Sequence, residues 1–344
     1  ARYGEGLGWG LSLGGGGIWF ISWQVAYLFE LASAGIDVTG ADRVVGTSAG
    51  SVVSSVLEAG NLSRLHTELK VLAKLPKLIG VLAPASKLST SQETARDLFG
   101  SAGDADPERI RNIGHAALAA STPSAATMSR NVGLILGSRS WPSPALHITC
   151  VDAFTGERCV VTSRSRVPLH RAVAASSAVL GLFAPQPMAD RRCMDGGVSG
   201  SGTHLDLLAG ARRALVVSLT DGSDLVEPMM TVSPGDIEAE FAALRGSGTE
   251  LMVRTPEAVD PDRLMDPSAV PEAIAMGRRQ AAADADELRD VLIGREVAPE
   301  PAPLGTVEVA TKARAYTSDG VFVAQVEAVE GARWHPYRVF RDET

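Results

Sequence analysis

The stretch Arg43-Val44-Val45-Gly46-Thr47-Ser48-Ala49-Gly50-Ser51-Val52-Val53 decides the fold. Its first three residues form a short apolar strand signal, and its last three begin a segment of helical composition. Between them, Gly46 and Gly50 flank Ser48 in a G-x-S-x-G pattern. A strand that turns sharply into a helix needs small residues at the turn, because larger side chains would clash with the backbone. The stretch therefore predicts an α/β protein in which Ser48 lies at a nucleophile elbow.

A run of four glycines lies upstream, directly after the apolar strand signal Trp9–Leu13. Consecutive glycines let the backbone N–H groups of Gly15, Gly16 and Gly17 converge on one point, as a tetrahedral oxyanion requires. A phosphate-binding loop is the alternative interpretation. The run has neither the G-x-G-x-x-G spacing nor a GK[ST] sequence, which favours the oxyanion interpretation.

An aspartate with two glycines lies downstream, after a short strand predicted for residues 191–194. Gly196 and Gly197 follow Asp195 directly, so this loop can approach another loop closely. If Asp195 meets Ser48, its carboxylate can act directly as a general base. A plain turn aspartate is the alternative for this tripeptide taken alone.

Strand and helix signals alternate along most of the chain, which predicts a mostly parallel central sheet with helices on both faces. Residues 62–143 differ, because they are rich in Ala, Leu, Ser and Lys with several prolines, and we expect a helical cap or insertion there. The expected domain organisation is one main domain over 1–297, a Pro-rich linker over 298–304 and a small β-strand appendage over 305–344. The appendage is a candidate contact for a second copy of the chain or for another protein.

The composition bounds the class of protein. Of the 344 residues, 45% are hydrophobic and 21% are charged, which is ordinary for a globular protein with a sizeable core. The net charge of -8 argues against nucleic acid as a partner, because phosphate binding needs a concentrated basic face. An acidic total still permits contact with a membrane surface through a local basic or apolar patch.

Cysteine usage and the ends of the sequence bear on metals and location. Three cysteines without a CxxC pair, and the absence of HExxH, predict reduced thiols and no structural or catalytic metal. We find no apolar run of roughly 18 residues and no basic start followed by an apolar stretch. We therefore expect a cytoplasmic protein, with peripheral contact at the membrane allowed.

The glycine run, the serine pentapeptide and the aspartate tripeptide, in this order, resemble the bacterial patatin-like phospholipase family. The resemblance extends over about Leu7 to Ile293, and further similar stretches are Asp152-Ala153-Phe154-Thr155-Gly156-Glu157, Arg171-Ala172-Val173-Ala174-Ala175-Ser176 and Leu264-Met265-Asp266-Pro267. Members of that family use a Ser-Asp dyad without histidine. The combination of motifs is far more specific than any one of them.

The resemblance implies a lipid acyl hydrolase that passes through an acyl-enzyme intermediate. Ser48 would be the nucleophile, Asp195 the base, and the backbone amides of Gly15, Gly16 and Gly17 the oxyanion hole. Phospholipids or other acyl esters would be the substrates. Neither a cofactor nor calcium is expected, because the dyad itself supplies the activation.

Three positions depart from the family's pattern. Trp19 and Phe20 stand where the glycine loop often has Arg or Lys and then Gly, and His204 stands where an Asn is often found. The aromatic pair either faces an acyl chain, crowds the loop, or belongs to a buried helix face, and the last is the interpretation that we favour.

Two other functions remain open. The first is an α/β-hydrolase esterase with a Ser-Asp-His triad, for which His204 or His335 would be required. The second is a pseudoenzyme or scaffold, which Trp19-Phe20 in the glycine loop and the β-strand appendage would motivate.

Overall fold

The computed structural model describes residues 3–72, 74, 89–100, 107–199, 202–221, 234–257, 259–292, 312–316, 322–329 and 333–339 of the chain. The linker expected over 298–304 lies outside these residues.

A central sheet runs through the molecule, with the strand order β5-β6-β3-β2-β1-β7-β8 and with β4 paired to β3. The pairs among β3, β2, β1, β7 and β8 are parallel, whereas β4, β5 and β6 pair antiparallel. The expected mostly parallel sheet is confirmed. The strands are β1 (Trp9–Leu13), β2 (Arg43–Thr47), β3 (Leu146–Asp152), β4 (Arg158–Val161), β5 (Gln186–Met188), β6 (Arg191–Asp195), β7 (Arg213–Val217) and β8 (Glu250–Arg254).

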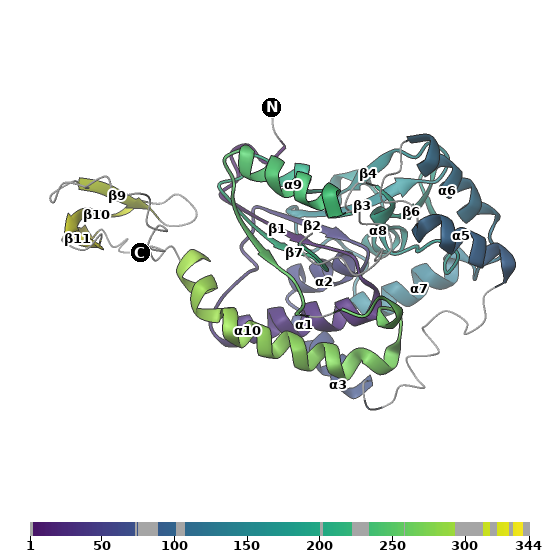
Figure 1. The fold of residues 1–344 in the computed structure, drawn as a ribbon, viewed down its shortest axis with the longest axis horizontal. Coiled ribbons are helices and arrows are strands. Elements are labelled where there is room, and N and C mark those ends of the chain that lie inside the picture. The colour runs from purple at the N-terminus through teal and green to yellow at the C-terminus, as the bar shows by residue number, and fades with distance from the viewer. Residues whose placement is uncertain are drawn as a thin grey trace.

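Helices cover both faces of this sheet, as the sequence predicts (Figure 1). Side chains of α1, α2, α3, α7, α8 and α10 share one buried cluster with the sheet, while α6 and α9 belong to two further clusters. All five residues of β1 are buried, which is typical of a parallel strand covered on both faces. The helices are α1 (Gly17–Ser33), α2 (Ala49–Glu58), α3 (Leu62–Leu72), α5 (Thr90–Gly100), α6 (Pro107–Ala119), α7 (Ala125–Leu136), α8 (Leu169–Ser176), α9 (Pro234–Gly246) and α10 (Val270–Leu292).

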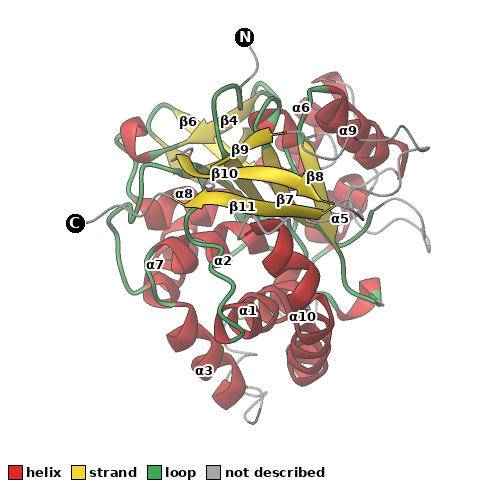
Figure 2. Cartoon of the chain, turned by 90° about the vertical axis from the view of Figure 1, so that its left-hand side faces the viewer, coloured by secondary structure: helices red, strands yellow, loops and turns green. Residues whose placement is uncertain are grey.

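The described parts of residues 62–143 are largely helical, since α3, α5, α6 and α7 lie there. Their role as a cap over the site stays a prediction. Within 305–344, the strands β9 (Lys312–Tyr316), β10 (Phe322–Val329) and β11 (Arg333–Val339) form a separate antiparallel sheet, visible in Figure 2. That the main domain ends at 297 also stays a prediction. Within the described residues, no helix combines the length and the apolar character needed to cross a bilayer.

Helices α1 and α10 pack tightly against one another, and α1 supplies the aromatic side chains of this contact. The Trp23 ring stacks on the Tyr27 ring with centroids 4.7 Å apart, and the Tyr27 hydroxyl donates to Asp284 on α10 at 2.6 Å. Gly277 on α10 faces this helix so closely that a Cβ there would lie 2.5 Å from the Trp23 carbonyl oxygen. The contact therefore needs a residue without a side chain at this position.

Replacing Gly277 by alanine is expected to lower the free energy of unfolding by about 2 kcal/mol, in the range of overpacked cores. Glycine to alanine within a helix otherwise stabilises by roughly 0.5–1 kcal/mol, so the two changes differ in sign. Gly246→Ala at the end of α9 is the matched control, because a Cβ there meets nothing within 4 Å. Urea unfolding of both variants measures the difference, and equal stability of the two would contradict the close approach.

Candidate active site

The register of β3 brings two strand ends together. Thr149 pairs with Thr47 of β2, and the next residue, Cys150, pairs with Asp195 of β6, while β4 pairs with both Thr149 and Cys150. A strand residue has one neighbour on each edge. Strand β4 therefore occupies one edge of β3, and β2 and β6 follow one another along the opposite edge. Because they run in opposite directions, Ser48, which follows Thr47, meets Asp195 at their junction.

Ser48 lies at the elbow between β2 and α2. Its φ of 51° and ψ of −119° place a non-glycine residue in the positive-φ region, and its side chain is 8% exposed. Glycine is needed on both sides, because a Cβ on Gly46 would meet Ser51 and Ser54, and one on Gly50 would meet the Leu13 carbonyl. Ser48 is also the N-cap of α2, where the helix dipole favours developing negative charge.

Serines of α8 and its C-cap hold the elbow in this strained conformation. The Ser48 N–H donates to Ser176 Oγ at 2.9 Å, and Ser177 Oγ donates to the Ser48 carbonyl at 3.2 Å. The hydroxyl of Ser51 also donates to that carbonyl, at 2.6 Å. The contact of Ser177 with Ser48 had no signal in the sequence, because Ser177 caps α8, which is far from Ser48 along the chain.

The Asp195 carboxylate is 1% exposed and has few partners. Oδ1 accepts the Gly197 N–H at 2.8 Å. Burial raises the pKa of Asp195 to about 7, against the opposing effects of the Gly197 N–H and the Ser48 hydroxyl. Oδ2 is buried without an aligned hydrogen bond among the described residues. The Ser48 hydroxyl is thus near enough to stabilise the carboxylate but is not fully aligned with it, as is common in sites without substrate.

Gly196 allows the aspartate loop to reach the elbow. A Cβ on Gly196 would lie 2.7 Å from the Thr149 carbonyl oxygen and 3.0 Å from Cγ2 of Thr47. The Thr47 and Thr149 hydroxyls are hydrogen-bonded to each other at 2.7 Å. The absence of a side chain at Gly196 therefore lets the loop that carries Asp195 approach Ser48 closely, as the sequence predicts for such a loop.

The glycine loop lies on the other side of Ser48. A Cβ on Gly15 would lie 3.0 Å from Ser48 Cβ and 3.6 Å from Ser48 Oγ. Gly16 is the N-cap of α1, and Gly17, with φ of 65°, is its first residue. No backbone carbonyl of the described residues accepts the N–H groups of these three glycines.

Three hydrogen bonds of Gly14 fix this loop in place. The Gly14 carbonyl accepts both the Gly50 N–H, at 3.0 Å, and the Gln24 side-chain amide, at 2.9 Å. The Gly14 N–H donates to Val217 at 2.9 Å. Gln24, a buried polar residue of α1, is a supporting residue that the sequence pattern did not reveal.

Trp19 and Phe20 do not enter the loop. Their side chains are 3% and 0% exposed and belong to the main core cluster. The Phe20 ring stacks on Trp23 with centroids 5.6 Å apart. The interpretation of these residues as a buried helix face is confirmed.

His204 is a buried neutral residue that contacts the aspartate loop through the backbone. Its Nε2 lies 3.0 Å from the Gly196 carbonyl oxygen, and its Nδ1 lies 3.4 Å from the Arg158 guanidinium. Burial, and then the Arg158 charge, lower the pKa of His204 to about 4. A neutral imidazole with Nε2–H donating to Gly196 fits this environment. The other candidate of the triad hypothesis, His335, has no described side chain.

A His204→Gln variant separates the dyad from the triad. The Gln amide can still donate to the Gly196 carbonyl, so we expect ester hydrolysis within about tenfold of the wild type if His204 only positions the loop. A catalytic histidine would instead cost about 10³-fold or more. The kcat of His204→Gln and His204→Ala against a soluble ester distinguishes these outcomes, with His170→Gln, at a distant half-buried histidine, as the control.

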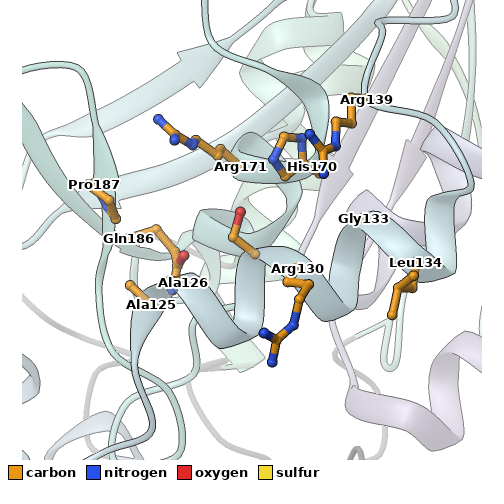
Figure 3. A pocket seen from close by; sticks show the side chains of 11 residues that line it. Ala125, Ala126, Arg130, Gly133, Leu134, Arg139, His170, Arg171, Gln186 and Pro187 are labelled. Atoms are coloured by element: carbon orange, nitrogen blue, oxygen red, sulfur yellow. The ribbon is translucent and has the colours of Figure 1, made fainter.

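A groove lies away from Ser48. This groove, of about 410 Å³, is formed by α7, the start of α8 and β5, and Arg130, Arg139, Arg171, His170 and Leu134 are among its lining residues. Figure 3 shows Arg130 and Arg171 pointing away from one another. Neither Ser48 nor Asp195 lines this groove. The groove lies at the start of α8, whereas Ser176 at the end of α8 contacts Ser48, so the groove does not lead to the Ser48 site.

The comparison with family models agrees with the motifs. A family model described as patatin-like phospholipase matches residues 11–208. Among solved structures, the type III effector protein ExoU is similar at 16% identity and a TM-score of 0.31, over 79% of this chain and 53% of that chain. The chain therefore spans about half the length of that structure. No curated protein matches the sequence.

Proposed function

The chain belongs to the patatin-like phospholipase family, and from that premise we propose that it hydrolyses acyl esters of phospholipids or related lipids through a Ser48-Asp195 dyad. The observation that carries the proposal is the junction on β3, where a strained serine and a buried carboxylate meet beside the glycine loop. A lipid or other acyl ester is the substrate class, and no step requires a cofactor.

The proposed reaction has two steps, acylation of Ser48 and hydrolysis of the acyl-Ser48 ester, and Asp195 acts as the base in both. The Ser48 hydroxyl attacks the acyl carbonyl while Asp195 takes its proton, and the N–H groups of Gly15, Gly16 and Gly17 stabilise the oxyanion. Asp195 then returns the proton to the departing alcohol, which leaves an acyl-Ser48 ester. Water then attacks this ester while Asp195 takes a proton from it. Asp195 returns that proton to the departing Ser48 Oγ, which releases the fatty acid and restores both groups of the dyad.

A panel of lipids tests the substrate class. Vesicles of phosphatidylcholine, phosphatidylglycerol and a lysophospholipid, and micelles of a monoacylglycerol, are incubated with the full chain, Ser48→Ala and a chain truncated at Pro299. Release of fatty acid by the full chain and not by Ser48→Ala supports the proposal. Cleavage of a short aryl ester with no release from any lipid contradicts it, and the truncated chain shows whether residues after 299 contribute.

We also propose that the arginine-rich groove contacts anionic membrane surfaces. Arg130, Arg139 and Arg171 are exposed, none has an ion-pair partner among the described residues, and Leu134 beside them is 72% exposed. Because their side chains diverge (Figure 3), they suit a field of many lipid phosphates better than one bound phosphate. This local positive patch is distinct in a chain of net charge -8.

Replacing the three arginines of the groove by glutamine is expected to weaken binding to phosphatidylglycerol vesicles by about 100-fold, at about 1 kcal/mol for each charge near the surface. Binding to pure phosphatidylcholine should not change. Arg245→Gln, at an exposed arginine of α9, is the control for loss of charge elsewhere. Sedimentation of vesicles at two salt concentrations measures the effect, and equal binding of the wild type and the triple variant contradicts the contact.

A further inference from the structure

The three cysteines of the chain converge on one face of the central sheet, although they are far apart in sequence. Cys150 on β3 pairs directly with Cys159 on β4, and Cys193 on β6 pairs with Asp152, two residues beyond Cys150. Paired residues and residues two apart on a strand share a face. The three Sγ atoms accordingly lie within 4.8 Å of one another. Cys150 and Cys193 are buried, and Cys159 is partly exposed.

We propose that Cys150, Cys159 and Cys193 bind a thiophilic divalent cation of the zinc type. Tetrahedral Zn–S bonds of about 2.3 Å place ligand sulfurs about 3.8 Å apart, so the three thiols need to move by no more than about 1 Å. Three protein sulfurs leave a fourth position, and the partial exposure of Cys159 gives water access to it. Binding is a substitution without redox change: each thiol loses its proton to solvent as its sulfur binds the cation.

The charges around the thiols favour a dication over a monovalent ion. Arg191 is the cation at the cluster, with Nη1 3.6 Å from Cys159 Sγ, but it also contacts the carboxylates of Asp152 and Glu157, each at 3.3 Å. Asp152 is nearly buried and lies on the thiol face. Two carboxylates and three thiolates therefore outnumber one guanidinium, and a cation of charge two offsets more of this excess.

The site lies against the strand that ends in Asp195. Cys150 pairs with Asp195 across the edge of β3, and Cys193 is two residues before it on β6. A bound cation would therefore tie β3, β4 and β6 together beside the catalytic junction. Because binding to the folded state alone stabilises that state, the melting temperature should rise with the cation concentration.

Cobalt(II) is a suitable probe, because thiolate-to-cobalt charge transfer reports sulfur ligands and these are the chain's three cysteines. The full chain, reduced and stripped of metal by a chelator under anaerobic conditions, is titrated with Co²⁺ and then with Zn²⁺. We expect one Co²⁺ per chain with a thiolate charge-transfer band, displacement by Zn²⁺ and a rise in melting temperature. Neither readout depends on hydrolysis of a lipid.

Cys159→Ser is the test variant, since the residue is partly exposed and the change keeps every histidine and carboxylate. We expect at least about 100-fold weaker Co²⁺ binding and no thermal shift with Zn²⁺, because loss of a residue that merely orients a metal ligand already costs up to this factor. Circular dichroism checks that the variant is folded. Reduced wild type without a charge-transfer band overturns the proposal. The proposal is also overturned if the wild type isolated in air contains one disulfide and one free thiol and still binds no metal after the disulfide is reduced.

Discussion

Ser48→Ala should abolish ester hydrolysis, with kcat lowered by about 10⁴-fold or more, the range seen when a serine nucleophile is removed. The side chain is small, and alanine keeps the Cβ that packs beside Gly15. The elbow is held by the Ser48 backbone N–H and carbonyl, which Ser176, Ser177 and Ser51 contact. The fold should therefore survive, and the loss should be confined to chemistry.

Labelling with a fluorophosphonate ester measures the nucleophile directly. The wild type should gain one adduct, localised to Ser48 by peptide mass, and Ser48→Ala should gain none. Ser55→Ala is the control, because this buried serine of α2 donates only to the Ser51 carbonyl, at 2.7 Å. An adduct on another residue, or hydrolysis by Ser48→Ala at the wild-type rate, would refute the assignment of the nucleophile.

The elbow and the sheet could be predicted because their signals are local. A strand, a turn that needs Gly46 and Gly50, and a helix follow one another directly in the chain, and each imposes its own residue types. The parallel sheet followed from alternating strand and helix signals. The approach of Asp195 to Ser48 came from the family resemblance, since no local pattern contains it.

What sequence reasoning missed depends on register between distant strands. The convergence of the three cysteines follows from which residue of β3 pairs with which residue of β4 and β6. The spacing of Cys150, Cys159 and Cys193 matches no metal motif, because such motifs describe ligands on one loop or hairpin. The prediction of no metal rests on sequence spacing alone, and spacing does not detect a cluster whose cysteines lie on three different strands.

Helix faces show the same limit. Trp19 and Phe20 follow the glycine loop directly, so the sequence left open whether they crowd it. The N-cap at Gly16 sets the first turn of α1, and that turn directs both rings into the core. Whether the two rings crowd the loop or enter the core depends on the direction of the helix axis, and tertiary packing fixes that direction.

The second large effect is expected for Asp195→Asn, which keeps the shape of the side chain and removes the base. We expect kcat to fall by about 10³-fold, within the range for loss of a general base. Asp190→Asn, at an exposed turn before β6, is the control for charge and should keep activity. Fluorophosphonate labelling should also slow in Asp195→Asn, because Asp195 activates Ser48. Full activity of Asp195→Asn would exclude the dyad.

The wild-type pH profile should carry the signature of this carboxyl group. The base must be ionised, and burial raises the pKa of Asp195 to about 7. Therefore kcat/KM should rise with pH and reach half its plateau near pH 7. A rate that is flat from pH 5 to pH 8 would contradict the role of Asp195 as the base.

The same pKa predicts how stability depends on pH. In the unfolded chain an aspartate ionises near pH 4, so between about pH 4 and pH 7 the folded state alone keeps the proton. Stability should consequently fall as pH rises through this window, by up to about 1.4 kcal/mol per pH unit from this group, and level off above pH 7. Asparagine does not titrate, so Asp195→Asn should gain stability relative to the wild type from pH 5 to pH 8. Urea unfolding of the wild type and Asp195→Asn at pH 5 and pH 8 tests this. If the difference in unfolding free energy between the two proteins is the same at both pH values, the buried carboxyl group does not hold its proton.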